Sequence, residues 1–173
     1  MRTFKKYASS VPVIALCLLV LGSAAAFAQK KFMILSSARP VVKVMLAGAV
    51  ERDDARVPVE QASLVKSGEV MDWTITSVNE GNAPANEYKA VGKIPAGTQF
   101  VAGSASATGA TVTYSIDNGK TFSAAPTVAE RQSDGTIKQV PAPVSMYHQI
   151  RYAWSAPLNQ GEKVNATYKV RLN

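Results

Sequence analysis

The side chains of this chain that could take part in catalysis are few, and the single histidine is the first to consider. His148 stands between Tyr147 and Gln149, where an extended segment begins. A catalytic triad needs a histidine that is oriented by a carboxylate and faces a nucleophile. The residues around His148 do not form that pattern, so we expect a histidine of a loop or the surface, without a catalytic role.

A second pattern with catalytic precedent is the pair Ser63 and Lys66, which has the S-x-x-K spacing of penicillin-recognising serine enzymes. In those enzymes the serine lies at the start of a helix and the lysine follows one turn later. Here the pair leads into a turn and a strand, and no Ser-Asp-Asn motif accompanies it. We therefore predict no catalytic residues. A hydrolase that uses His148 as its base is the least favoured interpretation.

Acidic pairs offer the only candidate ligands for a metal ion. Asp53 and Asp54 are adjacent in a charged segment, and Asp117 precedes Asn118 in a turn-forming sequence. Calcium needs six to eight converging oxygen atoms, which two adjacent acids do not provide. The sequence also lacks a glycine-rich phosphate loop opening a helix. We predict no metal site and no cofactor.

The N-terminal segment has the three parts of a secretory signal peptide. Three basic residues occur in the first six positions, and an apolar run covers 11–21. The motif Ala26-Phe27-Ala28 then matches the small residues that signal peptidase accepts. We predict that 1–28 is a cleaved signal peptide. The alternative is a retained anchor, but the run is short of the ~20 residues that span a bilayer.

Removal of the signal peptide changes the composition. The processed chain would begin at Gln29 and keep 16 basic and 12 acidic residues, a net charge of +4. Its basic residues are scattered, which argues against nucleic acid as a partner. Cys17 would leave with the signal, so the processed chain can form no disulfide. We expect a periplasmic or secreted protein that meets the membrane only through its signal peptide.

The processed chain is dominated by segments in which apolar and polar residues alternate with a period of two, as in half-buried strands. The predicted strands cover 41–50, 70–78, 86–93, 99–102, 111–116, 136–140, 149–154 and 164–172, with a return strand starting at Thr121. Turn-forming residues separate them. A charged loop is predicted over 51–56, and a long loop over 124–146 that contains the short strand at 136–140. The expected aromatic core consists of Trp73, Phe100, Tyr114, Phe122, Tyr152 and Trp154.

Closely spaced strands without a convincing helix are typical of a two-sheet sandwich. We predict an all-β, immunoglobulin-like sandwich of seven to eight strands over 41–173. The preceding residues 29–40 form a leader or a first strand, with the apolar stretch Phe32-Met33-Ile34-Leu35.

Several motifs resemble a family of conserved-repeat domains in bacterial surface proteins, catalogued as domain of unknown function 11. Residues 66–85, KSGEVMDWTITSVNEGNAPA, are similar to its signature P-G-D-x-V-x-Y-T-I-x-V-x-N-x-G. Residues 94–101, IPAGTQFV, resemble its L-P-A-G-x-x-F-V segment, and 114–122 and 150–152 resemble further pieces. The resemblance covers about 60–173. It implies an immunoglobulin-like fold, export, and a structural or adhesive role without catalytic residues.

The sequence thus favours a non-enzymatic domain with a structural or interaction role in the cell envelope or outside the cell, recognising an unknown protein or cell-surface partner. The alternative is a self-assembling subunit that donates its N-terminal segment as a strand to a neighbouring copy. Lys169 and Arg171 lie on one strand face and are candidates for a binding stripe, although such charges commonly face water. Asn165 begins a glycosylation sequon that we attribute to chance.

Overall fold

The computed structural model describes residues 38–52 and 55–173, and these residues are all-β. The predictions made for 1–28, for Cys17, for most of the 29–40 leader and for the pair Asp53 and Asp54 lie outside the described residues. The part of the leader that is described, 38–40, is not a strand.

Ten strands and two short 3-10 helices make up the regular structure of the described residues. The strands are β1 (Val42–Arg52), β2 (Ala55–Pro58), β3 (Val70–Asn79), β4 (Lys89–Lys93), β5 (Thr98–Phe100), β6 (Ala110–Ser115), β7 (Thr127–Arg131), β8 (Ile137–Pro141), β9 (Gln149–Trp154) and β10 (Lys163–Leu172). The 3-10 helices are η1 (Val59–Gln61) and η2 (Val144–Met146).

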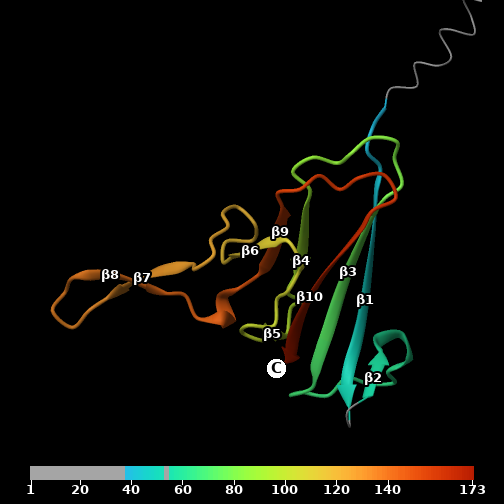
Figure 1. Cartoon of the computed structure of the whole chain (residues 1–173). Coiled ribbons are helices and arrows are strands. Elements are labelled where there is room, and N and C mark those ends of the chain that lie inside the picture. Colours follow the sequence, from blue (N-terminus) through green and yellow to red (C-terminus); the bar gives the residue numbers. More distant parts are fainter. Residues whose placement is uncertain (1–37, 53–54) are drawn as a thin grey trace, which may run out of the picture. The chain divides into compact units, whose positions relative to one another are not determined.

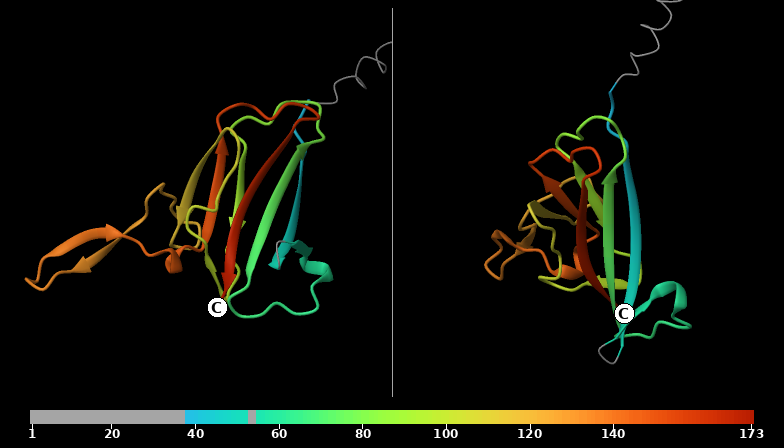
Figure 2. Two further views of the ribbon diagram at one scale, coloured as in Figure 1. Left: turned by 60° about the horizontal axis from the view of Figure 1, so that its bottom comes forward. Right: turned by 45° about the vertical axis from the view of Figure 1, so that its right-hand side comes forward.

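The strands form three antiparallel sheets (Figure 1). The largest has the order β2-β1-β3-β10-β5, the second has the order β4-β9-β6, and β7 pairs with β8. The first two sheets lie as separate layers in both views of Figure 2, which gives the fold its sandwich-like character. Because five strands face three, the second sheet is the narrower layer.

The core lies between these two layers and follows the predicted alternation. In β10 the buried side chains are those of Ala166, Tyr168 and Val170, whereas Asn165 and Arg171 on the other face are exposed. The same periodicity buries alternate residues of β9. The buried core cluster consists of Val50, Met71, Ile75, Ala90, Phe100, Ile150, Tyr152, Trp154, Ala166, Tyr168 and Val170.

Tyrosine hydroxyls tie the two layers together. The hydroxyl of Tyr168 in β10 donates to the carbonyl of Lys93 at 2.7 Å, and that of Tyr152 in β9 donates to the carbonyl of Thr167 at 2.8 Å. Both rings are almost fully buried. A buried polar group is costly unless it is hydrogen-bonded, so these bonds also specify how one sheet sits on the other. Burial raises the pKa of Tyr168 to about 12.

The predicted aromatic core is correct for most of its members. Phe100, Tyr152 and Trp154 are buried, and Trp73 and Tyr114 are partly buried against the same cluster. Phe122 is the exception among the six. It lies under the guanidinium of Arg151, whose Cζ is 4.3 Å from the ring centroid, and does not belong to the core cluster.

The two facing layers contain eight of the ten strands in the described residues, which agrees with the predicted seven to eight. The structure corrects three other predictions about the strands. The charged segment 51–56 is not simply a loop, because β1 continues to Arg52 and β2 begins at Ala55. The long loop predicted over 124–146 contains the β7–β8 hairpin, of which only β8 had a recognisable pattern. The return strand at Thr121 is reduced to one bridge between Tyr114 and Ser123.

Candidate functional site

His148 lies in a loop at the surface. It connects η2 to β9, and its backbone N–H donates to the carbonyl of Ser115 at 2.9 Å. Its side chain is exposed and makes no hydrogen bond to any residue that the structure describes. The position therefore agrees with the predicted loop histidine.

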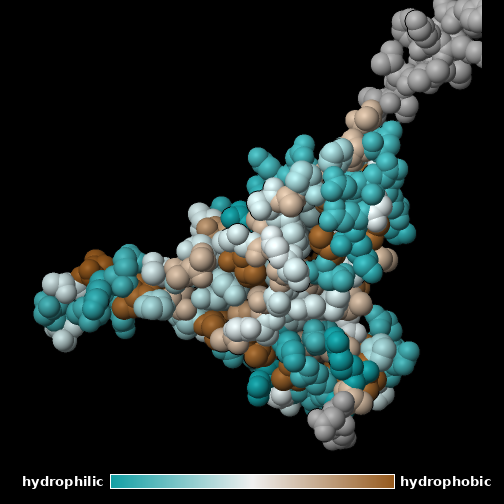
Figure 3. All heavy atoms as spheres, viewed as in Figure 1, coloured by the Kyte–Doolittle hydropathy of each residue, from teal (hydrophilic) through white to brown (hydrophobic). Residues whose placement is uncertain are grey.

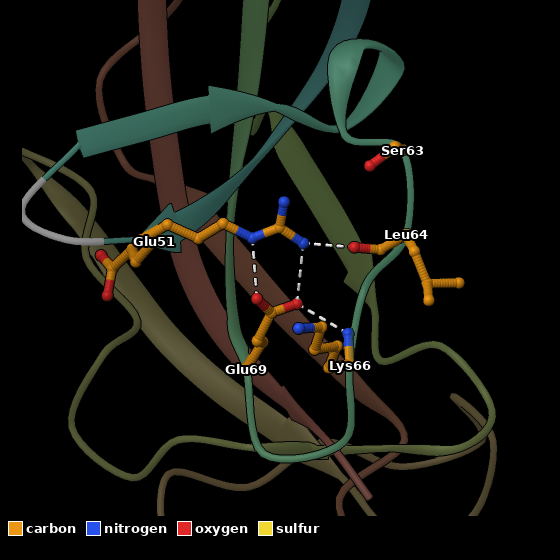
Figure 4. Close-up of a pocket in the computed structure, with 6 residues that line it drawn as sticks. Glu51, Ser63, Leu64, Lys66 and Glu69 are labelled. Carbon is orange, nitrogen blue, oxygen red and sulfur yellow. Dashed lines mark hydrogen bonds and ion pairs between the residues drawn. The ribbon is translucent and has the colours of Figure 1, made fainter.

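Ser63 and Lys66 line a polar pocket of about 670 Å³ at the end of β1 (Figure 4). Both are exposed in the irregular segment between η1 and β3, so Ser63 does not start a helix. Across the described part of the chain, no hydrogen bond joins their side chains. In Figure 4 the side chain of Lys66 extends away from Ser63.

The centre of this pocket is an ion pair between Arg52 and Glu69. Arg52 donates from Nε to one carboxylate oxygen at 2.7 Å and from Nη2 to the other at 3.0 Å, and also to the carbonyl of Leu64. The backbone N–H of Lys66 donates to the same carboxylate at 2.6 Å. The hydrogen bond from Arg52, followed by that from Lys66, lowers the pKa of Glu69 to about 2. These charges neutralise each other and fix the turn before β3.

The carboxylate of Asp117 is likewise hydrogen-bonded to residues close to it in the sequence. It accepts hydrogen bonds from the Thr121 hydroxyl at 2.6 Å, from the Thr121 backbone at 2.9 Å and from the Ser115 hydroxyl at 2.7 Å. These bonds, those from Thr121 above all, lower the pKa of Asp117. Asn118 and Gly119 have φ of 59° and 89°, as the predicted turn requires. Within 38–52 and 55–173 no group of three potential ligands converges on a metal position.

The candidate binding stripe on β10 is not a row of free cations. The ammonium group of Lys169 is 2.6 Å from Glu51 on β1, which neutralises it. Arg171, two residues further along the strand, is exposed near the end of the chain. Asn165 is also exposed on the same outward face. Lys169 therefore contributes an ion pair across the sheet rather than a binding surface.

An apolar groove lies between the edge strand β4 of the narrower sheet and strands β1 and β3 of the larger sheet. We call it the β1–β4 groove. It has a volume of about 490 Å³. It is lined by Val44 and Leu46 of β1, Trp73 and Ile75 of β3, Val91, Gly92 and Lys93 of β4, and Pro95 and Tyr168. Because β4 is the last strand of the narrower sheet, no strand of that sheet covers β1 in the described residues.

The floor of this groove exposes large apolar side chains. Val44 is 56% exposed and Leu46 is 57% exposed, although both point to the inner face in register with Ser77 and Ile75. Val91 on β4 is 45% exposed, but its side chain lies on the outer face of β4, opposite to buried Ala90 and Gly92. Isolated exposed apolar residues are common, whereas a contiguous set is a candidate for an interaction surface.

The rim of the groove is an unpaired strand edge. Trp154 N–H donates to the Tyr88 carbonyl, and Ile94 N–H donates to the His148 carbonyl. In an antiparallel pair alternate residues exchange both hydrogen bonds, so the even-numbered residues of β4 pair with β9. The backbone groups of Lys89 and Val91 therefore face the free edge, where no other described strand pairs with them. The site thus offers hydrogen-bonding groups beside an apolar floor.

Sequence reasoning found β1 but missed this site. The run Val44-Met45-Leu46-Ala47 is apolar on both faces of the strand. Such a run indicates a strand that is covered on both sides, or one that is completed by a partner. Because Lys43 lies between Val42 and Val44, the segment was interpreted as an ordinary strand with one apolar face.

Comparison of the chain with protein-family models, with curated proteins and with solved structures found no significant match. Among the residues described, no helix has the length and apolar character needed to cross a membrane.

Proposed function

We propose that this chain is an exported, non-enzymatic, immunoglobulin-like domain with a structural or interaction role in the cell envelope or outside the cell. The basic n-region, apolar run and Ala26-Phe27-Ala28 motif support export. The two facing antiparallel sheets and the resemblance of 66–85 to conserved-repeat surface domains support the immunoglobulin-like assignment.

The single observation that carries an interaction role is the β1–β4 groove. It combines an apolar floor at Val44 and Leu46 with the free backbone groups of β4. An extended peptide can add to such an edge through main-chain hydrogen bonds while alternate side chains fill the apolar floor. The partner that fits is an extended segment with apolar residues at every second position.

Selection of random nonapeptides on the immobilised processed chain tests this function. We expect the selected peptides to have alternating apolar residues and to lose at least about tenfold in affinity for a Leu46→Glu variant, as for a charge placed against an apolar contact. Leu64→Glu is the matched control, because Leu64 is 67% exposed and lies outside the groove. Peptides that bind the Leu46→Glu variant as well as the unaltered chain would contradict the proposal.

A further inference from the structure

The β1–β4 groove lies beside the free edge of β4, where one further strand can be added to the sheet. Gly92 of β4 packs on the ring of Tyr168, so β4 lies over β10, and the hydroxyl of Tyr88 just before β4 donates to Ser77 of β3. Neighbouring strands of a sheet are about 4.8 Å apart and facing sheets about 10 Å apart. A strand added to the free edge of β4 would therefore lie above β1 and β3, over Val44 and Leu46.

The chain contains a segment suited to that place. Phe32-Met33-Ile34-Leu35, here called the apolar tetrad, lies in the N-terminal segment outside the described residues. It is followed by Ser36 and Ser37, and then by Ala38, from which the structure is described. As a strand, the tetrad would place two of its side chains on each face, and the floor of the groove also offers two side chains, Val44 and Leu46.

The length of chain between the tetrad and β1 decides which copy supplies it. Leu46 lies eight residues beyond Ala38, which is about 26 Å along an extended strand. The residues of the tetrad precede Ala38 by three to six positions, about 10–20 Å, before any residues are used for a reversal of direction. Folding back on its own domain, the tetrad reaches the level of Val44 at best and does not reach Leu46. A tetrad from a second copy has no such restriction.

We propose that the apolar tetrad of one copy docks in the β1–β4 groove of another as an added strand of the β4-β9-β6 sheet. This inference rests on the proposed function, since it names the partner of the same groove. The contact joins two different surfaces, so it is head-to-tail and generates rings or chains of copies unless two copies exchange tetrads and close a dimer.

The charges near the contact predict its salt dependence. Lys89 and Lys93 are exposed at the two ends of β4, and Lys30 and Lys31 directly precede the tetrad. Either direction of the added strand brings like charges together. Salt screens this repulsion. We expect added salt to increase association.

Sedimentation of the processed chain, 29–173, over increasing concentration up to about 1 mM tests the proposal, because that covers even weak complexes. We expect concentration-dependent association that weakens at least about tenfold in Ile34→Asp and in Leu46→Glu, since each places a charge in the apolar contact. Ile137→Asp and Leu64→Glu make the same exchanges at exposed positions outside the groove, and both should associate like the unaltered chain. Val44→Glu places a charge at a second position of the groove floor and should weaken association as Leu46→Glu does.

Mixing the two deficient variants gives the sharpest outcome. Ile34→Asp keeps an intact groove and Leu46→Glu keeps an intact tetrad, so their mixture should form one-to-one pairs, detected by native mass spectrometry, that do not extend. A monomeric unaltered chain, or an Ile34→Asp variant that associates normally, would overturn the inference. In those cases, if the unaltered chain still binds the selected nonapeptides and Leu46→Glu does not, the proposed function stands and only the self-association is wrong. If the unaltered chain does not bind nonapeptides either, the proposed function and the self-association are both wrong.

Discussion

At the scale of single residues, Asn79 shows how a turn-forming residue becomes part of the core. Its side chain is fully buried at the end of β3. Its Nδ2 donates to the carbonyls of Ala83 and Leu158 at 2.8 and 2.9 Å, and its Oδ1 accepts from the backbone of Val41 and Gly81 at 3.2 and 3.0 Å. One amide thus holds the start of β1, the loop after β3 and the loop before β10.

Replacement of Asn79 should therefore be costly. Asn79→Leu removes the amide's bonds to the Ala83 carbonyl and to the N–H groups of Val41 and Gly81, whereas the Leu158 carbonyl keeps its bond from the Ala85 N–H. We expect a loss of about 2–4 kcal/mol in the free energy of unfolding. Urea denaturation measures it. Asn82→Ala is the control, because Asn82 also bonds a backbone N–H, that of Arg39 at 2.9 Å, but in an exposed position where water replaces it. Equal losses for the two variants would contradict this role of Asn79.

The ion pair of Arg52 and Glu69 predicts a pH dependence of stability. The pKa of Glu69 is about 2 in the folded chain against an ordinary value of 4.5, so the unfolded chain binds the proton more tightly. The stabilisation is fully present above pH 4.5 and is lost as the pH falls towards 2. Glu69→Gln should thus lose less stability than the unaltered chain over that interval in urea titrations. Arg52→Met should flatten the profile less than Glu69→Gln does, because the backbone N–H of Lys66 still donates to the carboxylate. A Glu69→Gln profile parallel to that of the unaltered chain would contradict the assignment.

Residue-level prediction from sequence was uneven for a physical reason. The turn at Asn118 and Gly119 was predictable, because positive φ is a local property of those residue types. The burial of Asn79 was not, because its partners Ala83 and Leu158 depend on which loops meet. Gly92 is similar. A Cβ there would lie 2.6 Å from the ring of Tyr168, a contact known only from the packing of the sheets.

At the scale of elements, strands with one buried face were predictable and strands without one were not. The alternation in β3, β9 and β10 arises because one face meets the core. In the β7–β8 hairpin most side chains are exposed, and Figure 3 shows hydrophobic and hydrophilic side chains mixed over its surface. No burial pattern marks β7, so the sequence suggested a loop.

The first half of β1 is a strand element that contributes little to the core of its own domain. This predicts a contrast between two residues that face each other in the sheet, Leu46 and Ile75. Leu46→Glu should change the free energy of unfolding by no more than about 0.5 kcal/mol, as for an exposed position. Ile75→Glu buries an unpaired charge and should cost several kcal/mol, about 3 or more. Comparable losses in both variants, measured by urea denaturation of the monomer, would show that β1 is already covered.

At the scale of the whole molecule, the export prediction concerns residues 1–28, whereas the two-layer fold is formed by the residues that the structure describes. Composition and alternation were sufficient for an all-β fold, because a facing pair of sheets needs only one apolar face on each. The unequal widths of the layers were not predictable, since they depend on which strand ends each sheet. The candidate site follows from that inequality, which explains why no motif pointed to it.

Export predicts a defined mass for the processed protein. Mass spectrometry of the protein purified from outside the cytoplasm of an exporting host should give the mass of residues 29–173, because the Ala26-Phe27-Ala28 motif predicts cleavage after Ala28. A membrane-associated product that retains the first 28 residues would contradict the prediction and favour an anchor.

The central claim is that the free edge of β4 and the groove beside it are where this protein meets its partner. Residue-resolved amide hydrogen exchange tests it most directly. In dilute protein the N–H groups of Ala90 and Gly92 should be protected, because they face β9, while that of Val91 should exchange rapidly. With copies associated or a selected peptide bound, Val91 should become protected. A Val91 amide that is protected in the monomer, or that exchanges equally fast in the complex, would contradict the claim.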